Sequence, residues 1–203
     1  MNAIDEGAGQ PARHKPAKHK RADAQRNEQA LLAAAAAVFV TTGVEAPVRD
    51  IAAAAGVGMG TIYRHFPTRA DLVVAVYRHQ VEACVEAGRV LLANGGSPHA
   101  ALDQWVNLFV DFLVTKHGLA AALQPDSVGF NALHAYFLDR LVPVCAQLLA
   151  AAAQAGEISA DIDAYGLMRG IANLCVGVDN DPRYEGRRMV ELLIAGLLQS
   201  RLT

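Results

Sequence analysis

A group of hydrogen-bond donors between Arg49 and His65 carries the most specific chemistry in this sequence. Its members are Arg49, Thr61, Tyr63, Arg64 and His65. Side chains of these types donate to phosphate oxygens and to the edges of nucleic-acid bases. Arg64 also carries a planar guanidinium, which can form two parallel bonds with guanine. These residue types therefore point to a polyanionic partner, and to DNA if one helix presents them to a groove.

The elements that must position these donors are two short helices joined by a glycine turn. Residues 48–66 read V-R-D-I-A-A-A-A-G-V-G-M-G-T-I-Y-R-H-F. Ile51 and Ala55 are four apart and share one helix face, and the same spacing recurs in the second half. Gly56 stands where the first helix must stop in a left-handed conformation. The pattern predicts a helix-turn-helix, whose second helix enters the major groove of DNA.

Position along the second helix sorts the donors by role. The residues at its start are expected to face base edges; they are Met59, Gly60 and Thr61. Arg64 can contact either a base or a phosphate. Arg49 and Arg69 stand at the starts of two helices that flank this one, and we expect both to contact backbone phosphates. The alternative for each residue is an ordinary solvated surface.

This stretch resembles the DNA-binding segment of the TetR family of bacterial transcriptional regulators. The similarity starts in residues 26–43, an apolar helix that ends in T-T-G, and continues through I-A, A-G-V, G-T-I-Y and H-F to Arg69 and Leu72. The resemblance implies phosphate contacts for Tyr63 and His65. It also implies a homodimer that binds a palindromic operator in double-stranded DNA, with repression as the usual mode and a small-molecule effector as the signal.

Two positions depart from the family pattern. Members usually carry Ser or Thr where this chain has Pro47-Val48, and another where it has Gly58. Proline is sterically compatible with the first position of a helix, and glycine is a tolerable N-cap. The departures therefore concern local phosphate contacts and leave the predicted fold unchanged.

Composition favours an all-helical chain. Of the 203 residues, 53% are hydrophobic, many of them alanine, which is the best helix former. Alternating strand patterns flanked by turn residues are absent. The sequence predicts an all-α protein of about nine helices. We expect a disordered basic arm over 1–24, a three-helix DNA-binding domain over 25–70 and an effector-binding and dimerisation domain over 71–203.

Charge is divided unevenly along the chain. Residues 1–70 hold nine Lys or Arg and six Asp or Glu, whereas the remainder hold nine and fourteen. A basic end beside an acidic body suits a protein that meets a polyanion at one end only. The basic run over 13–21 is either a solvated tail or an arm that follows DNA into the minor groove.

An aromatic stripe in the second half could line an effector pocket. Its members are Trp105, Phe109, Phe112, Phe130, His134 and Phe137. Core packing is the commoner fate of such a stripe, but the head needs few of the predicted helices, and sites between the helices of bundles are common. Both interpretations stay open on the sequence alone.

The last two predicted helices, over 165–178 and 189–202, are apolar and contain small residues that let helices approach closely. A two-fold dimer through these helices explains them, because a helix-turn-helix protein gains affinity from two half-sites. In the resembled family the final two helices form the dimer as a four-helix bundle.

Other functions receive little support from the sequence. His79 and Glu82 have a metal-binding helical spacing, but a second such pair is missing, so no metal or cofactor is expected. Phosphate-loop and nucleophile motifs are also missing, which argues against an enzyme. Cys84, Cys145 and Cys175 fit small buried residues in a reducing cytoplasm, and no membrane partner is predicted. The alternative functions are a helical ligand carrier or interaction protein with a vestigial DNA-binding head and, third, a small bundle enzyme that uses His79 and Glu82.

Overall fold

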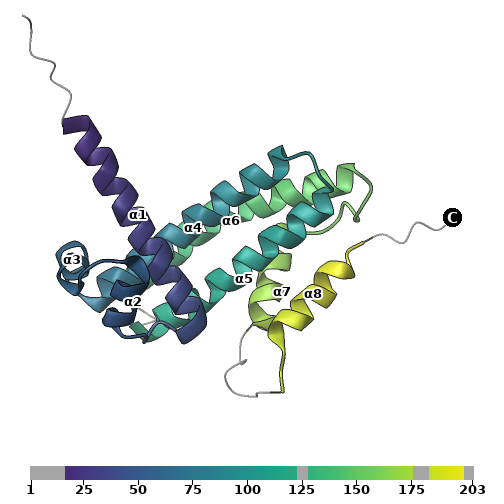
Figure 1. Cartoon of the computed structure of the whole chain (residues 1–203). Helices are drawn as coiled ribbons and strands as arrows, with labels where there is room; N and C mark the ends of the chain where they lie inside the picture. The colour runs from purple at the N-terminus through teal and green to yellow at the C-terminus, as the bar shows by residue number, and fades with distance from the viewer. Residues whose placement is uncertain (1–16, 123–127, 176–182, 199–203) are drawn as a thin grey trace, which may run out of the picture.

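The computed structural model describes residues 17–122, 128–175 and 183–198, with side chains for all of these except 17–22, 114–122 and 128–130. This part of the chain forms helices and no named strand, so the all-α prediction is confirmed. The helices are α1 (Ala17–Thr42), α2 (Val48–Ala55), α3 (Met59–His65), α4 (Arg69–Ala93), α5 (Pro98–Ala122), α6 (Val128–Gln154), α7 (Ala164–Leu174) and α8 (Gly186–Ala195). Helices α1–α3 form a head at one end of the α4–α6 bundle, and α7 and α8 pack beside α5 (Figure 1).

Local signals set several boundaries where the sequence places them. Gly43 follows α1 with φ +84°, and Gly56 caps α2 with φ +65°. The amide of Val57 donates to the carbonyl of Ala52 at 3.0 Å, which closes the turn before α3. Thr68 begins α4 with a capping box, in which the Asp71 amide donates to Thr68 Oγ1 at 3.1 Å. These caps satisfy backbone groups that a helix end leaves unpaired.

Some boundaries differ from the prediction. Helix α1 begins at Ala17, so the last part of the expected arm is helical, while residues 1–16 lie outside the described part of the chain. Helix α5 continues through Gly118 to Ala122, and the described residues form eight helices where the sequence predicted about nine. A glycine inside a helix costs only about 1 kcal/mol, so Gly118 does not by itself end the helix. Pro47 is the N-cap of α2 and not its first residue.

The bundle core is built on close contacts among α4, α5 and α6. The indole nitrogen of Trp105 donates to the Cys84 carbonyl at 2.9 Å, and the Tyr77 hydroxyl donates to the Leu133 carbonyl at 3.1 Å. A Cβ at Gly88 would lie 2.2 Å from Val144 Cγ1, so only glycine lets α4 approach α6 this closely.

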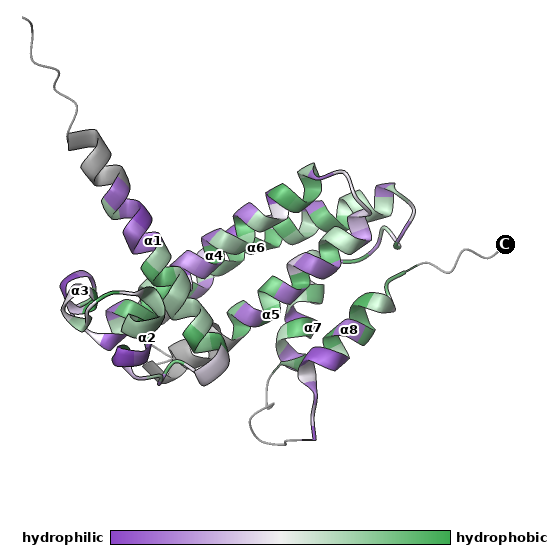
Figure 2. Ribbon diagram, in the orientation of Figure 1, coloured by the Kyte–Doolittle hydropathy of each residue, from purple (hydrophilic) through white to green (hydrophobic). Residues whose placement is uncertain are grey.

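The hydropathy of α1 changes along its length. Figure 2 shows that α1 is hydrophilic in its first coloured turns and hydrophobic where it joins the head.

Helix α6 also meets the length and composition of a membrane span. The stretch Asn131–Gln154 has a mean hydropathy of 1.3. Its buried residues Leu141, Cys145 and Leu148 pack against other helices of the bundle, and α6 contacts α4, α5 and α7. These contacts fit a core helix. Pro143 lies inside α6.

Candidate DNA interface and ligand pockets

The predicted recognition helix, α3, is fixed to the head by one apolar face. Ile62 is 1% exposed and Phe66 is 6% exposed. They join a core that includes Phe39 of α1 and Ile51 of α2. This anchoring orients a helix of only seven residues, which would not be stable alone. The opposite face of α3 is therefore held outward in a defined orientation.

The outward face carries the side chains that the sequence selects for DNA. Tyr63, Arg64 and His65 are exposed and Thr61 is half-buried. Met59 is 52% exposed although it is apolar. Arg64 has no hydrogen bond or ion pair within the described part of the chain, so its guanidinium is available to a partner. A Cβ at Gly60 would meet no atom within 4 Å, so packing does not require glycine there.

Arg49 and Arg69, the two expected phosphate contacts, differ sharply. The Arg49 side chain is 77% exposed, and its only described partner is the neighbouring Asp50, 3.3 Å away. Arg69 is 30% exposed, and its guanidinium turns inward to the loop between α1 and α2. There it donates to the carbonyls of Val44 and Ala46, the second at 2.7 Å, and lies 6.0 Å from the Phe39 ring centroid. In this structure Arg69 joins α4 to the head, and its expected phosphate contact stays a prediction.

Comparisons with known proteins agree with this geometry. The sequence profile described as "Bacterial regulatory proteins, tetR family" matches residues 31–76, and that of the "Transcriptional regulator SbtR-like, C-terminal domain" matches residues 97–199. The chain belongs to the TetR family of bacterial transcriptional regulators. The resemblance read from residues 26–72 is thereby confirmed, and it extends to the C-terminal domain.

Two solved structures match this TetR-family protein over most of both chains. The TetR transcriptional regulator SCO0520 from Streptomyces coelicolor is 33% identical, with a TM-score of 0.70 over 86% of this chain and 99% of its own. The TetR regulatory protein from Mycobacterium vanbaalenii is 34% identical, with a TM-score of 0.64 over 89% of this chain and 99% of its own. The repressor KstR2 from Rhodococcus jostii is 31% identical over 97 residues, and this match spans 48% of its length.

The aromatic stripe packs as core in the TetR-family bundle. Trp105, Phe109 and Phe112 are at most 1% exposed, and Phe137 is 3% exposed. The Trp105 and Phe109 rings stack with centroids 5.6 Å apart, and Phe109 stacks on Phe137 at 6.1 Å. The cavity beside His134 and Phe137 has a volume of about 30 Å³, far below the roughly 300 Å³ of a small ligand site. The side chain of Phe130 lies outside the described residues.

A larger pocket lies elsewhere, between α1, α4 and α5. Its volume is about 410 Å³, within the usual range for a small-molecule site. Phe112 is the one member of the aromatic stripe that lines it, and Gln80 and Cys84 also line it. Sequence reasoning missed this pocket because four of its ten lining residues are alanine, which carries no chemical signal. The available clue was Gln80, a polar residue at a helical spacing shared with buried Val76 and Tyr77.

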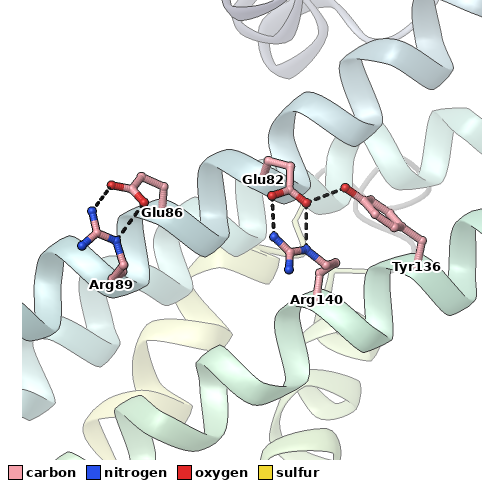
Figure 3. A network of polar contacts seen from close by, with 5 residues as sticks. All are labelled: Glu82, Glu86, Arg89, Tyr136 and Arg140. Atoms are coloured by element: carbon pink, nitrogen blue, oxygen red, sulfur yellow. Dashed lines mark hydrogen bonds and ion pairs between the residues drawn. The ribbon is translucent and has the colours of Figure 1, made fainter.

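Glu82, which the sequence pairs with His79 at a metal-binding spacing, binds to side chains of α6 instead. The Glu82 carboxylate accepts two bonds from Arg140 of α6, from Nε at 2.8 Å and from Nη2 at 2.6 Å, and a third from the Tyr136 hydroxyl (Figure 3). The Arg140 hydrogen bonds are the largest influence on Glu82 and lower the pKa of that carboxyl from its ordinary value of 4.5. Glu82 therefore joins α4 to α6.

The cysteines behave as the sequence predicts where they are buried. Cys84 and Cys145 are free thiols inside the bundle. Burial raises the pKa of each to about 12, so neither is a thiolate at neutral pH. Cys175 is half-buried. Cys84 and Cys145 therefore serve as small apolar residues of the core.

Proposed function

We propose that this TetR-family protein is a homodimeric repressor that binds a palindromic operator through α3 and leaves it when a small effector binds. The observation that carries the DNA-binding step is the outward face of α3, where Arg64 has no partner among the described residues while Ile62 and Phe66 anchor the helix. Thr61 and Arg64 would read bases, and Tyr63, His65 and Arg49 would hold phosphates. The similarity to the KstR2 repressor supports repression as the mode.

Gly60 and Met59 also fit the proposed DNA interface. The open surroundings of Gly60 leave room for DNA to approach the backbone of α3. Met59 leaves apolar surface exposed beside it, which can contact a thymine methyl group. Both positions lie in the first turn of α3, the part of a recognition helix that faces base edges.

Dimerisation is proposed through α7 and α8. Tyr165 is 49% exposed, Leu192 is 51% exposed and Met189 is 36% exposed. Large apolar side chains left open on two neighbouring helices are typical of an interface between subunits. A two-fold axis there would pair the two heads for the two halves of an operator.

The dimer is tested by Leu192→Arg, with Val90→Arg as a matched control at an apolar side chain that is 42% exposed on α4. Light scattering should show monomers for the first variant and dimers for the second. Gly196 is a poorer target because a Cβ there would lie 3.3 Å from the Leu192 carbonyl oxygen and would disturb the end of α8. A dimeric Leu192→Arg variant with normal stability would reject this interface.

The DNA-binding step is tested by fluorescence anisotropy on DNA from beside the protein's own gene, at several salt concentrations. We expect tight binding that weakens as salt rises, because each phosphate contact releases counterions. Binding that is equally strong to unrelated DNA at all salt concentrations, or absent at low salt, would favour the ligand-carrier alternative.

A further inference from the structure

Gln80, which lines the pocket between α1, α4 and α5, carries a buried hydrogen-bonding atom without a partner. Gln80 is 9% exposed, and its Oε1 atom is buried with no hydrogen bond. A buried carbonyl oxygen that has left water without gaining a donor lowers the stability of the folded chain. This loss of stability persists unless a hydrogen-bond donor from another molecule binds to the oxygen.

The burial of the lining residues gives the pocket a floor and an entrance. Gln80, Cys84 and Phe112 are buried and form its floor, whereas Leu108 is 42% exposed and Ala37 and Ala83 are exposed at its rim. Alanine side chains on α1 and α4 leave space that larger residues would fill. The pocket is thus mainly apolar and open to solvent on one side, with the polar residue Gln80 among its floor residues.

Charge at the rim does not favour an ionic ligand. Asp111 is the one charged residue that lines the pocket. Its carboxylate already forms an ion pair with Arg187 of α8. The Arg187 guanidinium also donates to Asn107 Oδ1 at 3.2 Å. The rim therefore offers no unpaired charge, and a neutral ligand fits the lining better than an ion.

We propose that this pocket binds a neutral, mainly apolar molecule with a hydroxyl group, and that the Gln80 amide turns toward the pocket so that Oε1 accepts from this hydroxyl. The inference rests on the proposed repressor function and places the effector at the junction of the head and the bundle, where Phe112 is the one member of the aromatic stripe that it would meet. The volume of about 410 Å³ suits a molecule of this class.

The position of the pocket gives a direct route to DNA release. Ala36, Ala37 and Val40 of α1 line it, while Ala35 and Phe39 of the same helix are fully buried in the head core. A molecule that enters between α1 and α4 pushes on the helix that carries the head. The two recognition helices of a dimer must stay about 34–36 Å apart to occupy successive major grooves, so a small rotation of each head weakens operator binding.

The test uses the straight-chain alcohols from 1-hexanol to 1-decanol, titrated calorimetrically into the full-length protein. We expect one alcohol per subunit and an affinity that rises with chain length. Ala83→Phe, at the exposed rim of the pocket, should abolish binding, whereas Ala93→Phe, at the exposed end of the same helix, should not. No binding of any alcohol to the wild type, or equal binding to the Ala83→Phe variant, would overturn the proposal.

A second variant examines the polar atom. Gln80→Leu removes the unpaired acceptor, so it should raise the melting temperature of the free protein and weaken 1-octanol binding about 2- to 10-fold, the loss of one hydrogen bond. A lower melting temperature with unchanged 1-octanol affinity would show that Gln80 is only a packing residue.

Operator binding separates this inference from the function on which it rests. The alcohol should weaken operator binding by the wild type and leave the Ala83→Phe variant unaffected, and operator should weaken alcohol binding by the same factor. A wild type that binds no operator even without alcohol rejects the repressor function. A wild type that binds operator but ignores an alcohol seated in the pocket rejects only the proposed regulation.

Discussion

Arg64 and Arg49 of the head are held differently from Arg140 and Arg187 of the bundle. In the head, Arg64 has no partner within the described residues, and Arg49 has a single contact with its neighbour Asp50. In the bundle, Arg140 is held by Glu82 through two bonds and Arg187 is held by Asp111. Cations left unpaired are available to a polyanion, whereas cations paired with carboxylates join helices and present little charge. The same residue type is thus left open to a partner in the head and joins helices in the bundle.

Arg69 lies between these two cases in sequence and in space. It begins α4, the helix shared by both regions, yet it donates to loop carbonyls and not to a carboxylate. Its Nε atom is buried without a hydrogen bond, and Glu45 lies 4.0 Å away. Carbonyl partners leave its positive charge in place, so Arg69 holds the head to the bundle without cancelling the basic character of the head.

The largest effect should come from removing Arg64, which has no partner within the described residues. Arg64→Ala in both subunits should weaken operator binding by about 2–6 kcal/mol, because each bidentate base contact contributes about 1–3 kcal/mol. Arg89→Ala is the control, because Arg89 is paired with Glu86 at 2.6 Å on the bundle. Anisotropy titrations measure both. Equal losses for the two variants would contradict the difference between head and bundle.

The next largest effect should come from removing a ring of the aromatic core. Phe109→Ala should lower the free energy of unfolding by about 3–5 kcal/mol if the ring is packed on all sides. Phe109 is 0% exposed and stacks on Trp105 and Phe137, which favours this outcome. Denaturant unfolding measures it. A loss below about 1 kcal/mol would mean that the ring faces open space, and would restore the effector pocket predicted from the aromatic stripe.

The next effect concerns Arg69, which joins the head to the bundle, in comparison with the exposed Arg49. Arg69→Ala should destabilise the protein by about 1.5–3 kcal/mol, the range for hydrogen bonds to a charged group. Arg49→Ala should be neutral for stability but should reduce the slope of log affinity against log salt by about one per subunit. Thermal unfolding and salt titrations separate the two. If Arg69→Ala changes only the salt slope, Arg69 is a phosphate contact after all.

The smallest effect concerns the Glu82 carboxylate on the bundle. Its pKa is lowered in the folded state, chiefly by Arg140, so it stabilises the fold above the ordinary value of 4.5 and that contribution is lost as the pH falls through the lowered value. Glu82→Gln should therefore lower the melting temperature slightly at pH 7 and have less effect at strongly acidic pH. A difference from wild type that is the same at pH 7 and pH 3 would show that ionisation of Glu82 has no part in the contact.

The sequence alone determined the elements whose signals are local. The glycine turn at Gly56, the cap at Thr68 and the spacing of Ile62 and Phe66 predict α2, α3 and the start of α4, because each depends on backbone conformation or on residues within one helical turn. The exposed face of α3 follows from the same periodicity. Family membership was also readable there, because the matching residues lie close together in the chain.

Only the tertiary structure decided which partners these residues meet. Arg69 and the Val44 carbonyl are 25 residues apart, and Glu82 and Arg140 are 58 apart, so helix periodicity says nothing about either contact. The fate of the aromatic stripe and the pocket beside Gln80 depend on how three helices cross and on where alanine leaves volume unfilled. Such volumes are properties of packing between distant segments, and the identity of any single residue does not specify them.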